Sequence, residues 1–205
     1  MSIIRISIKF LTDIAKQLQF IFALTISALS FIVGLFFGFI VGISSGSPPQ
    51  TAFEILREFV KYFQPFSPLS ALFIFLKNTL AVIIIWIFGS ILILPSIYSL
   101  GLNGYIVGRV ISWISIKHSS LLAISSIIPH GIIEIPALIL AGTAGILLGL
   151  NITCRILNFI KLFRVPILGF GFKDTFKIVL ISILMLIPAA IIETFITPLI
   201  ASSFT

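Results

Sequence analysis

His130 and Glu134 stand four residues apart in a stretch that is otherwise apolar, PHGIIEIPALILAGTAGILLG at residues 129–149. On a helix, this spacing places both side chains on one face. An imidazole and a carboxylate can carry protons, bind a cation or hydrogen-bond each other. Ionisable groups at bilayer depth are costly unless they are shielded and partnered. The pair therefore marks a candidate functional site, provided that this stretch lies in a membrane.

The composition places the chain in a membrane. Of 205 residues, 59% are hydrophobic and only 9% are charged, whereas a soluble domain carries about 25% charged residues. The formal net charge of +7 then predicts contact with lipid headgroups and a defined orientation, and no nucleic-acid partner. The single cysteine, Cys154, excludes an intrachain disulfide and a cysteine-rich zinc site.

The apolar runs predict one integral membrane domain over residues 1–205. Its fold class is all-α, a polytopic transmembrane helical bundle of about five spans with broken or re-entrant segments and interfacial amphipathic helices. Residues 1–19 predict a cytoplasmic amphipathic helix, and residues 51–63 predict an external interfacial helix that a capping box opens. The predicted membrane segments are residues 20–43, 69–99, 103–117, 131–151 and 178–200.

The middle of the chain leaves two arrangements open. Residues 103–117 are short for a full span, and Pro129 predicts a break in the chain just before His130. The segment is either a tilted span or a re-entrant half-helix, and irregular backbone at depth is tolerated only inside protein or beside water. We prefer the crossing. It puts the basic N-terminus and the basic residues of 152–177 on the cytoplasmic side, with the protein in the cell membrane.

Small residues recur at helical spacing on several segments. Such stripes let helix backbones approach closely and predict tight packing. A homodimer or another membrane protein is the expected partner, together with the lipid bilayer. The helix-packing glycines are Gly34, Gly38, Gly42, Gly104, Gly108, Gly145 and Gly149.

Three blocks of the sequence together resemble the stage II sporulation protein M family. They are FIFLKNTLAVIIIWIFGSILILPSIYSLGLNGYIVG at 73–108, the stretch at 129–149, and AAIIETFITP at 189–198. Lys77 stands where a second Asn is expected beside Asn78. The resemblance implies a polytopic membrane protein with a role in an assembly that remodels the membrane or cell envelope. The sporulation member acts with peptidoglycan-degrading partners in engulfment.

Polar residues from different spans form a predicted intramembrane cluster, for which three roles remain open. The groups can satisfy one another and fix helix register, form an ion or proton pathway, or hold the metal of an intramembrane hydrolase. We favour the first role, in a non-enzymatic scaffold or assembly component without cofactor or metal. A carrier or channel for a small ion, proton or lipid headgroup is the alternative. The cluster comprises Asn78, His130, Glu134, Glu193 and Arg109.

Overall fold

The computed structural model describes residues 2–46, 64–91, 93–161 and 169–204, and every regular element in these ranges is a helix. The all-α helical fold predicted from the sequence is confirmed. The elements are α1 (Ser2–Ser45), α3 (Pro68–Ile91), α4 (Ile93–Lys117), α5 (Ser120–Phe159), α6 (Phe172–Ile191), the π-helix η1 (Ile192–Ile196) and α7 (Thr197–Ser202).

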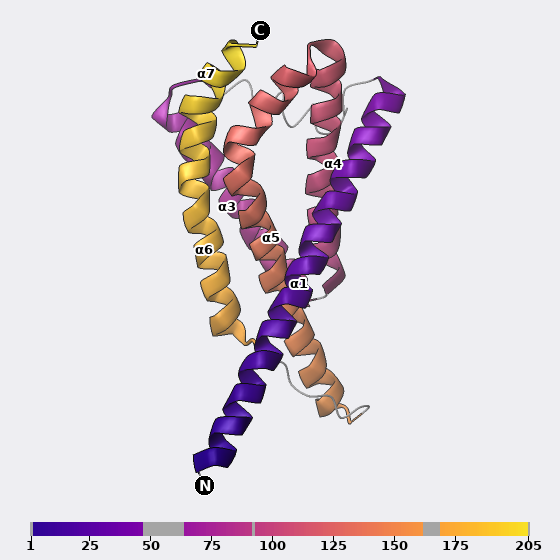
Figure 1. Cartoon of the computed structure of the whole chain (residues 1–205), viewed down its shortest axis with the longest axis vertical. Coiled ribbons are helices and arrows are strands. Elements are labelled where there is room, and N and C mark those ends of the chain that lie inside the picture. The colour runs from indigo at the N-terminus through magenta and orange to yellow at the C-terminus, as the bar shows by residue number, and fades with distance from the viewer. Residues whose placement is uncertain (1, 47–63, 92, 162–168, 205) are drawn as a thin grey trace.

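Four stretches among the described residues are long and apolar enough to cross a membrane: Thr12–Ser45, Pro68–Ile91, Ser120–Phe159 and Phe172–Ser202. Helix α4 is more polar, but its 25 residues reach about 37 Å at 1.5 Å per residue, enough for a hydrocarbon core of about 30 Å. It lies beside the upper part of α1 (Figure 1). The protein is a polytopic membrane protein, and a count of about five spans agrees with these helices.

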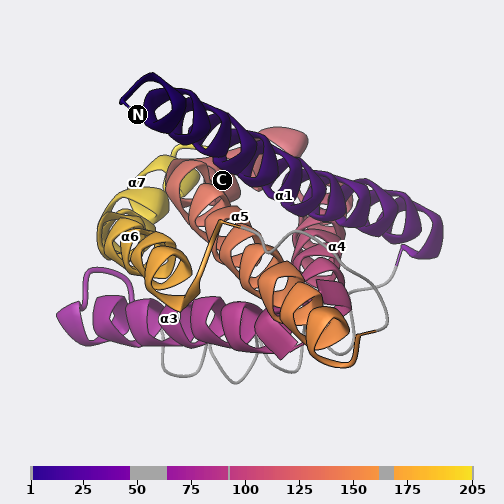
Figure 2. The same cartoon turned by 90° about the horizontal axis from the view of Figure 1, so that it is seen from below.

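The helices alternate in direction, so that the two ends of the chain lie at opposite ends of the bundle (Figure 1). Helix α5 passes through the middle, between α1 and α4 on one side and α3 and α6 on the other (Figure 2). In the most apolar 18-residue stretch of α5, 61% of the residues are buried, whereas in that of α1 only 22% are. Helix α5 is therefore the central helix, and groups on it can meet groups from several neighbours.

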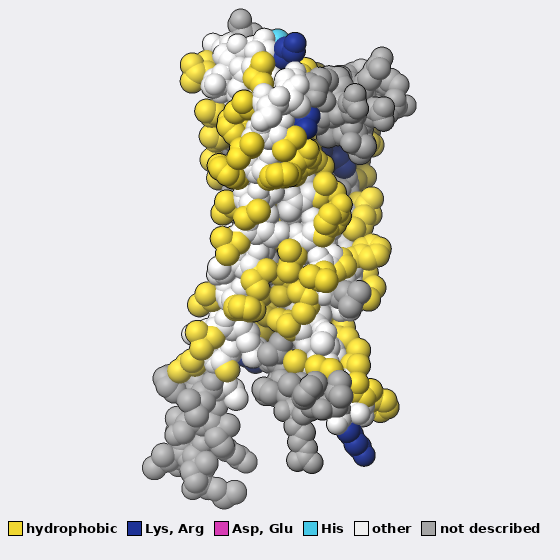
Figure 3. All heavy atoms as spheres, turned by 90° about the vertical axis from the view of Figure 1, so that its right-hand side faces the viewer, with side chains coloured by type: hydrophobic (Ala, Val, Ile, Leu, Met, Phe, Trp, Pro, Cys, Tyr) yellow, Lys and Arg dark blue, Asp and Glu magenta, His cyan; other side chains and the backbone are white. Residues whose placement is uncertain are grey.

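Apolar side chains form both the core and the outer surface. The core packs around α5 and draws on α3, α4 and α6; its members include Val82, Ile85, Leu100, Ala141, Leu148, Val179 and Leu186. Large apolar side chains are also exposed along the outer faces, among them Phe36, Leu80 and Ile181. Figure 3 shows one such face, with hydrophobic side chains over its middle and Lys or Arg side chains toward its ends. This distribution fits a surface in contact with lipid.

The apolar run at 69–99 contributes to two helices, α3, which ends at Ile91, and α4, which begins at Ile93. The Ser96 hydroxyl donates to the Ile85 carbonyl oxygen at 2.8 Å and ties the start of α4 back to α3. The sequence SLGLNG at residues 99–104, whose two glycines favour a loose end, lies inside α4. Its glycines do not end the helix, because they allow close contact with α1.

The predicted break at Pro129 is wrong. Both Pro129 and Pro136 lie inside the continuous helix α5, which bends in its upper part (Figure 1). Proline removes one helical hydrogen bond, but membrane helices tolerate this because packing against neighbours supports the bent helix. The helical geometry changes instead at η1. Residues 2–19 continue into the first span as part of α1, and the helix expected at 51–63 lies outside the described residues.

Helices α1 and α4 are parallel and meet along what we call the glycine seam, formed by Gly34, Gly38, Gly104 and Gly108. A Cβ added to Gly34 or Gly38 would collide with the backbone of Gly101 or Tyr105, and one added to Gly104 or Gly108 with that of Phe31 or Leu35. Gly42 faces the Ser112 side chain, while Gly145 and Gly149 of α5 approach the α3 backbone at Ile85 and Gly89. These stripes pack within the chain, so they give no evidence for a second copy.

Candidate functional site: an intramembrane polar cluster

Three helical regions bring polar side chains to one level of the bundle. Asn78 lies on α3, His130 and Glu134 lie on α5, and Glu193 lies on η1. Asn78 and His130 each stand roughly ten residues from the start of their helices, which is about 15 Å at 1.5 Å per residue. Both helices start at the same end of the bundle as the C-terminus (Figure 1). The groups therefore meet well inside the bundle, away from both ends.

The ligand atoms of His130, Glu134 and Glu193 all lie within 4.8 Å of one another, and the three side chains are half-buried. The Asn78 side chain, which is 4% exposed, donates a hydrogen bond to the Glu134 carboxylate. On the other side, His130 Nδ1 lies 3.4 Å from the Thr197 hydroxyl oxygen. The structure thus brings together four of the five residues predicted for the cluster, although 58 residues separate Glu134 from Glu193 in the sequence.

The π-helix η1 sets the position of Glu193. In this segment the Thr197 N–H donates to the Ile192 carbonyl oxygen, five residues back, so the turn is one residue wider than an α-helical turn. Pro198 has no N–H to give to the Thr194 carbonyl, and that oxygen instead accepts from the Phe66 N–H at 3.1 Å. The backbone just before α3 is thereby held to η1 at the residue that follows Glu193.

Lys77 is a member of the cluster that sequence reasoning missed. The side chain is exposed on α3, yet its ammonium is close enough to His130, Glu134 and Glu193 to interact electrostatically with all three. The sequence offered a signal, because Lys77 directly precedes Asn78 in an apolar span. The polar cluster is hereafter Lys77, Asn78, His130, Glu134, Glu193 and Thr197.

Arg109, the fifth residue predicted for the cluster, makes its described contacts with other groups. It is 8% exposed on α4, its Nη1 lies 3.3 Å from the Tyr105 hydroxyl, and its Cδ lies near Gly42 of α1. The contact with Gly42 places the Arg109 side chain on the side of α4 that faces α1. The cation beside the two glutamates is Lys77.

A family model described as "Stage II sporulation protein M" matches residues 27–198. The chain belongs to this family. It is also similar to two uncharacterized proteins of Methanocaldococcus jannaschii. One is 38% identical over 129 residues, which are 62% of this chain and 71% of that protein. The other is 34% identical over 121 residues, which are 59% of this chain and 53% of that protein. No solved structure matches the chain.

In this member of the stage II sporulation protein M family, the matched region covers the whole polar cluster, because residues 77–197 lie within 27–198. The cluster holds two carboxyl groups and one ammonium group. With both carboxylates ionised and His130 neutral, its formal charge is negative. A net charge at bilayer depth is costly, so the cluster favours an additional proton or cation. It can therefore act as a cross-link between helices, a proton carrier or a cation ligand.

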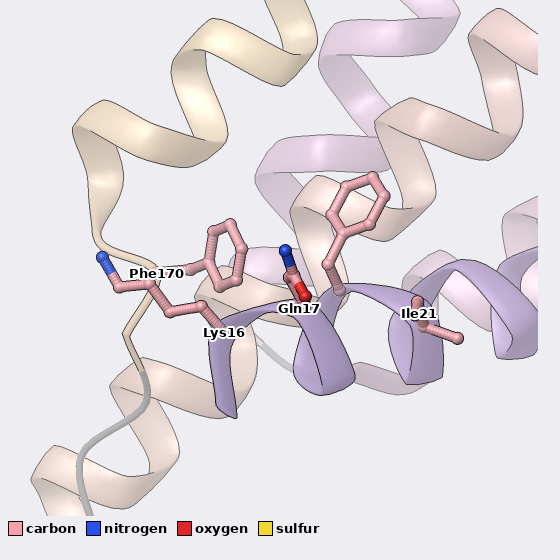
Figure 4. A pocket seen from close by; sticks show the side chains of 5 residues that line it. Lys16, Gln17, Ile21 and Phe170 are labelled. Atoms are coloured by element: carbon pink, nitrogen blue, oxygen red, sulfur yellow. The ribbon is translucent and has the colours of Figure 1, made fainter. Parts of the chain in front are cut away.

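A second feature lies at the opposite end of the bundle. A shallow hollow there is lined by Lys16, Gln17, Phe20 and Ile21 of α1 and by Phe170 before α6 (Figure 4). The Phe20 and Phe170 rings pack at 6.3 Å between centroids, and Gln19 Oε1 accepts from the Gly169 N–H at 3.2 Å. These contacts fasten α1 to the segment before α6. The hollow is far from the polar cluster and adds no ligand to it.

Proposed function

We propose that this protein is a non-enzymatic membrane scaffold, an assembly component of a complex that remodels the membrane or cell envelope. One observation supports this role above the others. Polar side chains of neighbouring helices contact one another, since Asn78 of α3 donates to Glu134 of α5 and His130 of α5 contacts Thr197 of α7. Polar groups used in this way hold helices in a fixed register. A rigid bundle of this kind presents fixed surfaces to partner proteins.

The basic residues support an orientation with the N-terminus in the cytoplasm. Lys16 of α1, Arg155 and Lys161 after the apolar part of α5, and Lys173 and Lys177 at the start of α6 all belong to the same end of the bundle (Figure 1). Lysine and arginine near span ends are enriched on the cytoplasmic side. In this orientation the polar cluster belongs to the outer half of the membrane. A partner protein in the cell envelope would contact the end of the bundle formed by α7 and the α4–α5 turn.

Flux measurements on reconstituted protein test the scaffold against the carrier. The full-length chain is placed in liposomes loaded with a pH-sensitive dye, and proton and monovalent-cation movement is followed under an imposed gradient. The variants are Glu134→Gln and Glu193→Gln. Asp13→Asn is the matched control, because Asp13 is an exposed acid on α1 outside the cluster. We expect flux no greater than in empty liposomes for every form. We also expect a lower midpoint of thermal unfolding in the two cluster variants alone.

A carrier would give the opposite pattern. A flux that the wild-type protein and Asp13→Asn share, and that both glutamine variants lose while their thermal stability is retained, would overturn the scaffold. Such a result would assign the polar cluster to a proton or ion pathway.

A further inference from the structure

The polar cluster has the donor set of a metal site. We propose that His130, Glu134 and Glu193 bind one divalent first-row transition-metal ion, which joins α5 to η1. An imidazole nitrogen and two carboxylate oxygens suit ions of the Mn²⁺ to Zn²⁺ series, whereas Mg²⁺ and Ca²⁺ prefer oxygen ligands alone. The sequence-based expectation of no metal rests on the absence of an H-E-x-x-H motif and on a donor set of one histidine and two glutamates, which is thin for zinc. It had no means of placing their ligand atoms within 4.8 Å of one another.

The spacing of the donors is close to what such an ion needs. Ligands at about 2.1 Å from a tetrahedral ion stand about 3.4 Å apart. The three groups must therefore approach one another by up to about 1.4 Å, which half-buried side chains can do by rotations about their χ angles. Glu193 is on a π-helical turn, and π-bulges within helices often occur at functional sites. Three protein ligands leave a further position for water or a fourth group.

Two neighbours would support the ligands from outside. Asn78 donates to Glu134, and Thr197 contacts the His130 ring. Metal-bound carboxylates and imidazoles are regularly held by such hydrogen bonds, which fix their orientation. Asn78 is buried while Glu134 and His130 are only half-buried, so the support lies deeper in the protein than the ligands. This is the arrangement expected if an ion sits on the accessible side of the ligands.

The charge of the cluster favours the ion as well. Lys77 shares the space around the same groups. Its side chain is exposed, and a long lysine side chain can turn toward the headgroups. With Lys77 turned away, two ionised carboxylates and one divalent cation sum to zero, and a neutral site is the least costly at bilayer depth. Binding also displaces any proton held by the ligands, so that affinity falls in acid.

Co²⁺ titration of the purified full-length protein, free of any histidine tag, tests the site. Protein stripped with EDTA is titrated in a Cys154→Ser background, which removes the single thiol. We expect one Co²⁺ per chain and a rise in the midpoint of thermal unfolding. Glu193→Gln should lower the affinity for Co²⁺ at least 10-fold. The loss of a residue that only hydrogen-bonds a metal ligand already lowers metal affinity by about 10-fold or more. His118→Gln and Asp13→Asn, which change an exposed histidine and an exposed acid, should bind as the parent does.

One further variant identifies a ligand directly. His130→Cys in the Cys154→Ser background should bind Co²⁺ with a thiolate-to-metal charge-transfer band that the parent lacks. The proposal is overturned by a parent that binds no stoichiometric ion and gains no thermal stability from it, which would leave the cluster binding protons only. Binding that Glu193→Gln does not weaken, or a cysteine variant without the band, would overturn it too. The effect of Co²⁺ on the midpoint of thermal unfolding of the parent protein tests the metal site even where a variant does not fold. The inference is independent of the scaffold role, which only the flux result can reject.

Discussion

The glycine seam and the polar cluster hold the bundle together by opposite means. In the seam, Gly34, Gly38, Gly104 and Gly108 remove side chains so that two backbones touch. In the cluster, side chains from three helical regions reach toward a common point through hydrogen bonds and charges. Lipid supplies little hydrophobic drive for helix association, so membrane helices depend on both close packing and polar contacts.

The two regions differ in how many arrangements of their groups they allow. The seam has one arrangement, because any added atom meets backbone that has no room to move. The cluster has several, since its charge and bonds depend on protons, on Lys77 and on any bound cation. The seam is thus the fixed part of the molecule and the cluster is the part that can respond to conditions. Each prediction below asks whether this division is correct.

The largest effect should come from the seam. Gly108→Ala would put a methyl group into the Leu35 carbonyl and the Phe39 nitrogen. Overpacking against backbone cannot be relieved by a rotamer change, and we expect a loss of about 3 kcal/mol in the free energy of unfolding. Gly131→Ala is the matched control, because its new Cβ would meet only side-chain atoms at 3.5 Å or more. Reversible unfolding in mixed detergent micelles measures both.

In the control, Gly131→Ala should change the free energy of unfolding by less than about 1 kcal/mol, with alanine favoured in a helix. Equal losses in the two variants would mean that helix packing along α1 and α4 is no tighter than elsewhere, and the contrast between the regions would disappear.

A smaller effect is expected in the cluster. Glu134→Ala leaves the buried Asn78 amide without its acceptor, which should cost about 2 kcal/mol. Glu134→Gln keeps an acceptor oxygen in place and should cost less than half as much. Unfolding in the same micelles at neutral pH gives both values. A glutamine variant as unstable as the alanine variant would show that the charge of Glu134, and not its hydrogen bond, supports the bundle.

The smallest effect belongs to the edge of the cluster. Thr197→Val replaces the hydroxyl that lies 3.4 Å from His130 Nδ1 with a methyl group of similar size. We expect a loss below about 1 kcal/mol, as for single polar contacts between membrane helices. A loss as large as that of Glu134→Ala would extend the core of the cluster to η1 and α7.

Much of the fold could be predicted from the sequence, because the bilayer requires long apolar helices and these are visible in the composition and in the lengths of the apolar runs. The helix ends could not. Pro129 and Pro136 are tolerated in α5 because helices pack around it, and Gly101 and Gly104 are helical because α1 lies against them. Both are tertiary effects that override local signals. The division of residues 69–99 between α3 and α4 is likewise supported by contact, including that of Ser96 with Ile85.

The cluster was partly predictable for the same reason. An acid, a histidine and an asparagine in apolar runs are conspicuous, so Asn78, His130, Glu134 and Glu193 could be selected by residue type. Which cation accompanies them depends on helix rotation and neighbour order, and a sequence shows neither. Arg109 and Lys77 looked equivalent in the sequence. The fold turns Arg109 toward α1 and leaves Lys77 beside the glutamates.

A double-mutant cycle between Asn78 and Glu134 tests the central claim most directly, that polar bonds between helices fix the bundle. Asn78→Ala, Glu134→Ala and the double variant are unfolded under the same conditions as the parent. We predict that the double variant loses about 1 kcal/mol less than the sum of the single losses, because the second change removes no further bond. Strictly additive losses would contradict the account, since the two residues would then stabilise α3 and α5 independently.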